Sequence, residues 1–285
     1  MNVLVTGGGG QVGRAVAATA PAGHGVIVIP HAELDIANAA AVAEALQTSD
    51  AEWIVNAAAY TAVDRAESEP ALARAINETA VGVLGAAARA AGARMVHLST
   101  DFVFDGRANR AYLPDDAPNP LSIYGETKLA GERRALESGC EAIVLRTAWV
   151  YAASGRNFAL TMLRLLAERE EVRVVADQIG TPTWAGGLAA AIWGLIDAGA
   201  PAGIQHWTDL GVASWYDFAV AIQDEGLARG HLSRRVPIVP ITSAEYPTPA
   251  RRPAFSVLDT RSTQALVNAP ARHWRHQLQR LFDEL

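Results

Sequence analysis

The sequence predicts an α/β protein with a doubly wound parallel sheet and a smaller C-terminal lobe. In the first half of the chain, short apolar runs alternate with longer alanine-rich stretches. This βαβα rhythm is typical of a parallel sheet covered by helices on both faces. The apolar runs are nearly uninterrupted, as expected for strands that are buried on both sides. With 285 residues, the chain is long enough for a large sheet domain and a second lobe.

Five strands and four helices are expected before residue 147. The strands are predicted at 2–6, 26–29, 53–56, 95–99 and 142–146. The helices are predicted between them, at 11–19, 39–47, 66–91 and 121–137.

After residue 146 the pattern loosens. A helix near 158–167, a strand near 172–175 and a helix near 185–196 are each compatible with the sheet domain. Proline and arginine accumulate between Arg234 and Pro253, which indicates irregular loop structure. We therefore expect a sheet domain over 1–150, with 184–207 packed on it, and a smaller lobe over 151–285 that closes over a substrate.

The composition of the chain limits the kinds of molecule that it is expected to bind. A net charge of −6 disfavours a nucleic-acid binder, which usually carries a basic face. The single cysteine, Cys140, excludes a disulfide framework and favours a reducing cytoplasm. The longest uncharged apolar stretch, 184–196, is too short and too rich in glycine to span a bilayer. We expect a cytoplasmic protein that binds a small molecule, without a nucleic-acid or membrane partner.

A glycine turn follows the first strand. Gly7, Gly10 and Gly13 have the spacing that a tight turn, a close approach of backbone to pyrophosphate and close helix–strand packing require. The helix that starts here points unpaired N–H groups and a positive dipole end at the phosphates. We therefore predict a Rossmann-like dinucleotide site formed by these glycines with Gln11 and Val12.

The choice of dinucleotide is less strongly indicated. An acid directly after the second strand is typical of NAD sites, but here Ile29 is followed by Pro30 and His31, with Glu33 and Asp35 further on. No arginine stands there for a 2′-phosphate either. NADPH is favoured modestly, and use of NADH as well is compatible with these residues.

Tyr124 and Lys128 form a candidate catalytic pair. Four residues apart on a helix, they share one face. A nearby ammonium would draw the phenol pKa toward neutrality and prepare Tyr124 as a proton donor. The chain has 23 arginines and only one lysine, which makes chance placement of that lysine after a tyrosine a poor explanation.

A third catalytic group is expected at the carboxyl end of the strand at 95–99, where open α/β sheets bind ligands. Thr100 is the best candidate to bind the reacting oxygen beside Tyr124. Ser99 could equally be a second donor or a strand-end residue that satisfies the backbone. His97 is expected to be a core residue, because strand alternation places it within the sheet.

Longer segments resemble the extended short-chain dehydrogenase/reductase superfamily and, within it, the dTDP-4-dehydrorhamnose reductase family. The resemblance runs from the N-terminus to about Ser256 and covers most of the chain. It rests on the segments TGGGGQVG (6–13), NAAAYTAVD (56–64), STDFVFDG (99–106), YGETKLAGE (124–132), RTAWVY (146–151), DQIGTPT (177–183) and RRPAFS (251–256).

This resemblance implies reduction of the 4-keto group of dTDP-4-dehydro-L-rhamnose (dTDP-6-deoxy-L-lyxo-4-hexulose) to dTDP-L-rhamnose. That is the last step of dTDP-rhamnose biosynthesis, which serves lipopolysaccharide O-antigen. Tyr124 would protonate the new oxygen, and Lys128 would hold the nicotinamide ribose. Thr100 and Asp101 would orient the sugar, with Trp149 packed near it.

Further binding residues follow from the same resemblance. Asp35 and Ile36 would lie along the adenine, Arg252 would lie near the substrate diphosphate, and the phosphates and ribose would be met by Ala57, Ala58, Ala59 and Thr61.

Two positions depart from the family pattern. Phe102 stands on the substrate side where many members have a tyrosine, so any hydrogen bond from that hydroxyl is lost. Some members form metal-bridged dimers through an acid on the first helix, and here Arg14 and Ala15 occupy that stretch. No metal site is assigned, and a role for Mg²⁺ stays open, as does the choice between monomer and homodimer.

Two other functions compete with this one. The first is a non-catalytic binding protein similar to the regulatory subunit of methionine adenosyltransferase. The presence of Thr100, Tyr124 and Lys128 disfavours it, because a binding module has no physical need of a tuned phenol. The second is a reductase of another nucleotide-linked keto sugar.

Overall fold

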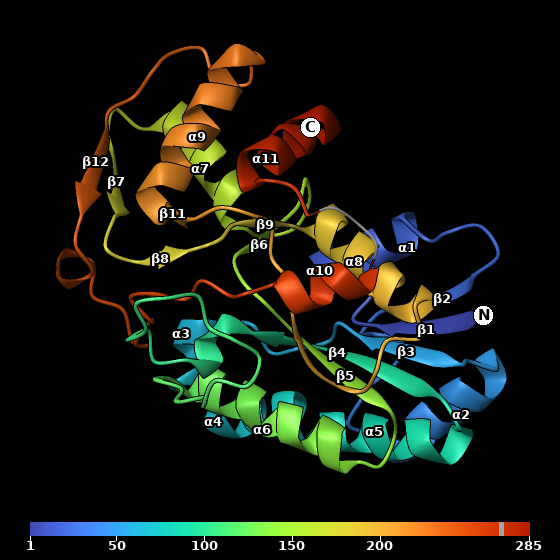
Figure 1. Cartoon of the computed structure of the whole chain (residues 1–285). Helices are drawn as coiled ribbons and strands as arrows, with labels where there is room; N and C mark the ends of the chain where they lie inside the picture. Colours follow the sequence, from blue (N-terminus) through green and yellow to red (C-terminus); the bar gives the residue numbers. More distant parts are fainter. Residues whose placement is uncertain (268–270) are drawn as a thin grey trace.

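A six-stranded parallel sheet forms the centre of the larger part of the molecule. The computed structural model describes residues 1–267 and 271–285. The strands lie in the order β10-β5-β4-β3-β1-β2, and all neighbouring pairs are parallel (Figure 1). They are β1 (Asn2–Thr6), β2 (Gly25–Ile29), β3 (Trp53–Asn56), β4 (Arg94–Thr100), β5 (Ala142–Thr147) and β10 (Gly203–His206). The predicted fold class is confirmed.

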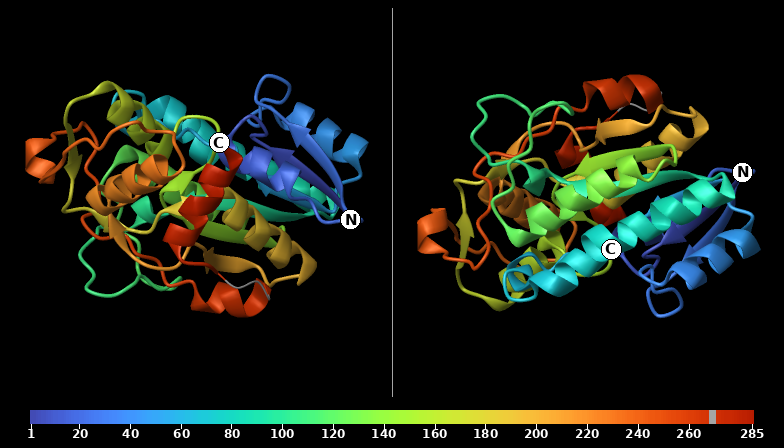
Figure 2. Two further views of the ribbon diagram at one scale, coloured as in Figure 1. Left: turned by 90° about the horizontal axis from the view of Figure 1, so that it is seen from above. Right: turned by 90° about the horizontal axis from the view of Figure 1, so that it is seen from below.

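Helices cover both faces of this sheet. One face carries α1 (Gln11–Ala18), α8 (Ala185–Asp197) and α10 (Arg261–Val267), and the other carries α2 (Ala39–Ser49), α5 (Ala80–Ala91) and α6 (Ile123–Glu137). Strand alternation sends side chains into both layers: Val3 and Val5 of β1 join one core, and Leu4 joins the other. Figure 2 shows the same layers from above and from below.

The stretch predicted as one helix over 66–91 is broken in the structure. It consists of α3 (Val63–Ala66), α4 (Pro70–Arg74), the π-helix η1 (Ala75–Thr79) and α5. Pro70 opens α4 at its first turn, because proline suits a helix start and cannot continue the helix before it.

The smaller lobe has a core of its own. Its elements are β6 (Val150–Tyr151), α7 (Phe158–Glu168), β7 (Val172–Val175), β8 (Ile179–Gly180), β9 (Thr183–Trp184), β11 (Ala213–Ser214), α9 (Trp215–Ala228), β12 (Ile238–Ile241), η3 (Ser243–Glu245) and α11 (Trp274–Glu284). Side chains of α7, β7, α9 and α11 form this core. Of the three elements compatible with the sheet domain, only α8 packs on the sheet.

One part of the loop prediction for 234–253 was wrong. Residues Ile238–Ile241 form β12, which pairs in parallel with β7. Pro240 lies inside this strand, and β12 has β7 as its partner in a two-stranded sheet. Proline is tolerated in such an edge strand, because the side of the strand without a partner needs no N–H donor.

The chain crosses between the two parts more than once. After the lobe begins, β10 returns to the sheet beside β5, and α8 packs against α1. The boundary at residue 150, with 184–207 on the sheet domain, stays a prediction. Within the described ranges, no helix combines the length and the apolar character needed to cross a bilayer.

Candidate active site

The glycine turn after β1 is shaped by close backbone contacts. Gly7 has φ +71°, and a Cβ added there would lie 2.5 Å from the Ala58 nitrogen. At Gly13 an added Cβ would lie 2.5 Å from the Gly7 oxygen. Gly10 is the N-cap of α1, and no described side chain caps this helix start. The first N–H groups of α1, at Gln11 and Val12, therefore face an open turn.

The loop after β3 is fastened to this turn by Asn56. Its buried side-chain oxygen accepts hydrogen bonds from the Thr6 hydroxyl (2.8 Å) and from the Ala58 backbone N–H (3.2 Å). Its amide nitrogen donates to Nδ1 of His97 at 3.0 Å. Burial and the charge of Lys128 lower the pKa of His97, so this ring is a neutral core residue, as expected.

The other predicted cofactor residues line the same region. Ala57, Ala58 and Ala59 are half-buried, and Thr61 is exposed on the same loop. Asp35 is exposed, and its carboxylate accepts the Ala37 N–H. The side chain of Ile36 packs in the core, which leaves only its backbone for a ligand.

One contact to the turn was not anticipated. Asn157, which caps α7 in the smaller lobe, donates a hydrogen bond to the side chain of Gln11 at 2.9 Å.

Thr100 and Tyr124 meet at the carboxyl edge of the sheet. Thr100 ends β4, and Tyr124 lies in the first turn of α6, where Ser122 accepts the Gly125 N–H. A Cβ on Gly125 would come within 2.3 Å of the Phe102 carbonyl oxygen, so glycine lets this turn approach the strand end. The hydroxyl of Tyr124 lies close enough to that of Thr100 for the Thr100 side chain to act against the rise in the Tyr124 pKa. The Thr100 hydroxyl also donates to Asp101 at 3.0 Å.

The electrostatics of this pair correct one expectation. Burial, assisted by the charge of Asp101, raises the pKa of Tyr124 to about 12. The expected lowering by Lys128 is not seen, since desolvation is the largest influence on the pKa of Tyr124. The Lys128 Nζ donates to the Leu98 carbonyl oxygen at 2.5 Å. Burial lowers the pKa of Lys128 itself to about 8. Tyr124 is therefore held as a phenol, ready to give up its proton to a strong base.

Asp101 is a buried acid between the two lobes. Burial raises its pKa to about 6, although the Thr100 hydroxyl donates to Oδ1 and the nearby Ser256 side chain also favours the ionised form. Its Oδ2 has no hydrogen-bond partner within the described part of the chain. Ser256 is distant in sequence, and its segment was noticed only through the family resemblance. Beside Asp101, the ring of Phe102 packs edge-on against Tyr124, with centroids 5.5 Å apart.

Trp149 has an unusual backbone and a fixed ring. Its φ is +48°, a conformation that non-glycine residues rarely adopt. Its ring stacks on Trp215 of the smaller lobe with centroids 3.5 Å apart and planes at 6°. A Cβ on Gly180 would collide with the Trp149 ring at 2.7 Å, so glycine makes room for it.

Arg252 joins the lobes next to a cavity. Its guanidinium forms an ion pair with Asp64 at 2.8 Å and also donates to Thr248. It contributes to a cavity of about 510 Å³ in the smaller lobe, whose lining includes Phe158, Met162, Val174, Gln178 and Trp215. Neither Asp64 nor Trp215 was assigned a role from the sequence.

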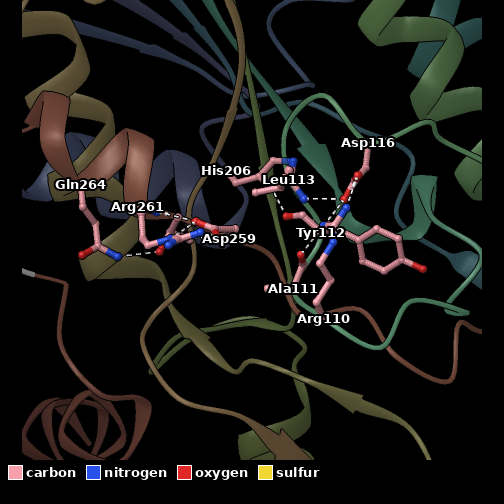
Figure 3. A network of polar contacts seen from close by, with 10 residues as sticks. Arg110, Ala111, Tyr112, Leu113, Asp116, His206, Asp259, Arg261 and Gln264 are labelled. Carbon is pink, nitrogen blue, oxygen red and sulfur yellow. Dashed lines mark hydrogen bonds and ion pairs between the residues drawn. The ribbon is translucent and has the colours of Figure 1, made fainter.

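A polar network holds the segment that carries Ser256. Tyr112 and Val257 are joined by a backbone hydrogen bond, as are Asp259 and Tyr112. Figure 3 shows how the Tyr112 carbonyl also contacts His206 of β10, while Asp259 pairs with Arg261. The loop around Tyr112 is itself braced by Arg110 and Asp116 at 2.8 Å.

The fold and this edge define a class of protein. In an open parallel sheet, ligands bind where the strand order reverses, and here that point lies between β1 and β3. The glycine turn lies at this point, and Thr100, Tyr124 and Lys128 lie at the ends of β4 and α6 beside it. This combination is that of an extended short-chain dehydrogenase/reductase.

Comparison with known proteins identifies the family. The RmlD substrate binding domain family matches residues 1–285. A dTDP-4-dehydrorhamnose reductase of Burkholderia thailandensis is 42% identical over 289 residues, which cover 97% of this chain and 96% of the relative. The chain belongs to the dTDP-4-dehydrorhamnose reductase family.

Solved structures agree. A dTDP-4-dehydrorhamnose reductase from Clostridium acetobutylicum superposes with a TM-score of 0.92 at 37% identity, covering 100% of this chain and 99% of the other. One from Bacillus anthracis, in complex with NADP, has a TM-score of 0.93 at 33% identity, with the same coverage of both chains. Among residues 1–267 and 271–285, no group of three or more His, Cys, Asp or Glu side chains is arranged to hold a metal.

Proposed function

We propose that this protein uses NADPH to reduce the 4-keto group of dTDP-4-dehydro-L-rhamnose to dTDP-L-rhamnose, the last step of dTDP-rhamnose biosynthesis. The observation that carries the proposal is full-length similarity to reductases of that name, in a chain with Thr100, Tyr124 and Lys128 at one sheet edge. A cytoplasmic setting is part of the proposal, and either a monomer or a homodimer is compatible with it.

The glycine turn fits a dinucleotide. Gly7 and Gly13 leave no room for a Cβ, and the start of α1 is free of a side-chain cap. The pyrophosphate would lie on these N–H groups, with Asp35 and the backbone of Ile36 on the adenine side. When bound, the nicotinamide supplies the hydride. The NADP complex of the Bacillus anthracis relative supports NADPH, and use of NADH stays a secondary expectation.

Tyr124 acts as the general acid. Reduction of a ketone creates an alkoxide, which is far more basic than a phenol with a pKa of about 12. Proton transfer from Tyr124 is therefore favourable although its pKa is raised. Thr100 holds the phenol and the reacting oxygen in place, and the ammonium of Lys128 binds the nicotinamide ribose.

The substrate would bridge the two lobes. Thr100 and Asp101 would orient the sugar, with the Trp149 ring beside it and Phe102 giving only apolar contact. The cavity beside Arg252 combines an apolar and aromatic lining with a guanidinium. These are the groups that a thymine ring and a diphosphate require.

The test is a coupled assay that follows nicotinamide absorbance. The protein is mixed with NADPH or NADH and with dTDP-glucose already converted by the 4,6-dehydratase and the 3,5-epimerase. Oxidation that needs every component, with dTDP-rhamnose as product, is expected. Cofactor binding without turnover would overturn the substrate assignment and favour another nucleotide-linked ketose or the binding-protein alternative.

A further inference from the structure

A buried ion pair lies one helical turn beyond Lys128 on α6. Glu132 and Arg146 are each about 1% exposed. Arg146 donates from Nε to one carboxylate oxygen of Glu132 at 2.8 Å and from Nη2 to the other at 2.7 Å. The hydroxyl of Ser99 donates to the same carboxylate at 2.5 Å. Glu132 and Arg146 have no part in the machinery assigned above, and Ser99, which the sequence left open as a second donor, bonds to Glu132.

The pair and the lysine fasten α6 to β4 in register. The Lys128 ammonium donates to the carbonyl of Leu98, and Glu132 accepts from the side chain of Ser99. Two successive turns of the helix are thus bonded to two successive residues of the strand. Thr100, which contacts Tyr124, follows directly on β4. The contacts of Glu132 and Lys128 therefore set the distance between the two halves of the catalytic edge.

A purely structural role explains this arrangement poorly. Removing two charges from water costs several kcal/mol per ion, and buried pairs can often be replaced by apolar residues without loss of stability. Arg146 also donates to the Pro114 carbonyl at 3.3 Å, which helps to satisfy its guanidinium. What an apolar pair could not supply is a fixed negative charge near the lone lysine.

We propose that Glu132, held by Arg146 and Ser99, is a positioning residue that fixes α6, and with it Lys128, against β4 and that favours the charged form of the lysine amine. The inference rests on the proposed function for the role of that charge. The structural claim, that the carboxylate of Glu132 controls the protonation of Lys128, stands apart from it.

The surroundings of Lys128 support the assignment. Several titratable or charged groups lie on the elements packed against this part of α6 and on α6 itself. They include His97 on β4, Asp101 on η2 (Asp101–Val103), Arg146 on β5, Glu67 beside the helix start, Glu78 on η1, Asp64 and Arg65 on α3, Arg74 on α4, Arg89 on α5, and Tyr124, Glu126, Glu132, Arg133, Arg134 and Glu137 on α6. Glu78 is already paired with Arg74 and Arg134. Burial lowers the pKa of Lys128, and among these groups Glu132 is the one that raises it.

The lone lysine makes a direct test possible. Protein labelled with isotope at the lysine ε-carbon gives one lysine signal, whose chemical shift follows the charge of Lys128 during a pH titration. The test variant is the double substitution Glu132→Gln with Arg146→Gln, because Glu132→Gln alone would leave a buried arginine unpaired. The control is Arg164→Gln with Glu168→Gln, an exposed pair on α7.

In the wild type and the control, we expect a midpoint near the pKa of about 8. In the test variant, we expect it lower by up to about one pH unit. Loss of Glu132 removes the charge that raises this pKa, while loss of Arg146 removes a cation that opposes it. The alkaline limb of kcat/KM should move with the midpoint. A shift of one full pH unit would lower the charged fraction at pH 7.5 from about three quarters to about one quarter, so activity there should fall by up to about threefold.

The outcomes separate the two claims. An unchanged lysine midpoint in a folded test variant overturns the inference, whatever happens to activity. A lowered midpoint in a protein whose wild type reduces no dTDP-keto sugar supports control of Lys128 and rejects the proposed function instead. If the double variant does not fold, Glu132→Asp replaces it: its withdrawn carboxylate should lower the midpoint by a smaller amount, and no change would again overturn the inference.

Discussion

At the residue scale, burial at the catalytic edge favours the neutral forms of Tyr124 and Asp101, because their charged forms are costly to remove from water. Tyr124 stays a phenol because burial raises its pKa, and Asp101 is held only partly ionised near pH 6 for the same reason. Each is a candidate for donating a proton or a hydrogen bond to a sugar. Their chemistry follows from desolvation more than from a neighbouring charge.

Tyr124→Phe tests the general acid. The ring keeps its edge-on contact with Phe102, so the variant should fold and bind NADPH normally. We expect kcat to fall by about 10²–10⁴, the usual loss for a general acid. Steady-state kinetics and cofactor fluorescence titration measure the two effects. Near-normal turnover would contradict the mechanism.

Asp101→Asn tests how much stability the protein loses when the buried carboxyl of Asp101 ionises. Because the folded pKa of about 6 lies above the ordinary aspartate value of 3.8, the folded state binds more protons than the unfolded chain between these values. Wild-type stability should therefore fall as pH rises from about 4 to about 6, by up to roughly 3 kcal/mol.

The asparagine variant lacks this cost, so urea unfolding should show it to be more stable than the wild type at pH 7, with the difference vanishing near pH 4. If the variant is equally stable or less stable at pH 7, ionised Asp101 does not destabilise the folded protein, and the prediction is wrong. The KM for the sugar should rise in either case.

At the scale of elements, helix α6 positions the site, because one of its faces packs closely against the neighbouring elements and carries the catalytic side chains. It carries Tyr124, Lys128 and Glu132 at intervals of four residues, all directed at the end of β4. Its glycines allow the approach: a Cβ on Gly131 would come within 2.0 Å of the Asn77 carbonyl oxygen in the π-helix η1. Such π-helical turns are frequent at functional sites, and here the turn supplies the groove for α6.

Gly131→Ala should push α6 away from η1. We expect a loss of about 1–3 kcal/mol in the free energy of unfolding, as for other overpacked cores, together with a lower kcat. Gly82→Ala on α5 is the matched control, because its nearest neighbour would be 3.7 Å away. That change should stabilise the protein by about 0.5–1 kcal/mol. Similar effects of both changes in chemical denaturation would argue against close packing at Gly131.

At the scale of the whole molecule, polar contacts join the two lobes around the site. They include the ion pair of Asp64 with Arg252 and the hydrogen bond from Asn157 to Gln11, and Ser256 lies near Asp101. The first lies beside the cavity, the second at the glycine turn and the third at the catalytic edge. The relative placement of the lobes therefore bears on binding of both the cofactor and the sugar nucleotide.

Arg252→Gln should weaken substrate binding more than chemistry. If Arg252 binds the diphosphate, the loss of a charge-assisted contact of about 1.5–3 kcal/mol should raise KM roughly ten- to hundredfold, with a smaller change in kcat. Arg251→Gln, which removes the neighbouring exposed arginine, should leave both parameters near wild type. Equal effects of the two variants on KM would show that Arg252 acts only through its positive charge and does not bind the diphosphate directly.

The local features of this protein follow from sequence alone. Apolar periodicity, glycine spacing and the Tyr124–Lys128 interval are short-range patterns, because strands, turns and helices form from neighbouring residues. They predicted the parallel sheet, the turn after β1 and the shared helix face of the catalytic pair. The resemblance of longer segments added the family.

Only the tertiary structure decided what depends on distant parts of the chain. It brought Ser256 to Asp101 and Arg252 to Asp64, stacked Trp149 on Trp215, and paired β12 with β7 where a loop was expected. It also withdrew the Tyr124 hydroxyl from water, so the pKa of Tyr124 rises where a fall was expected. The reason is physical: a pKa depends on how much water all surrounding atoms exclude, and that is a property of the folded molecule and not of residue spacing.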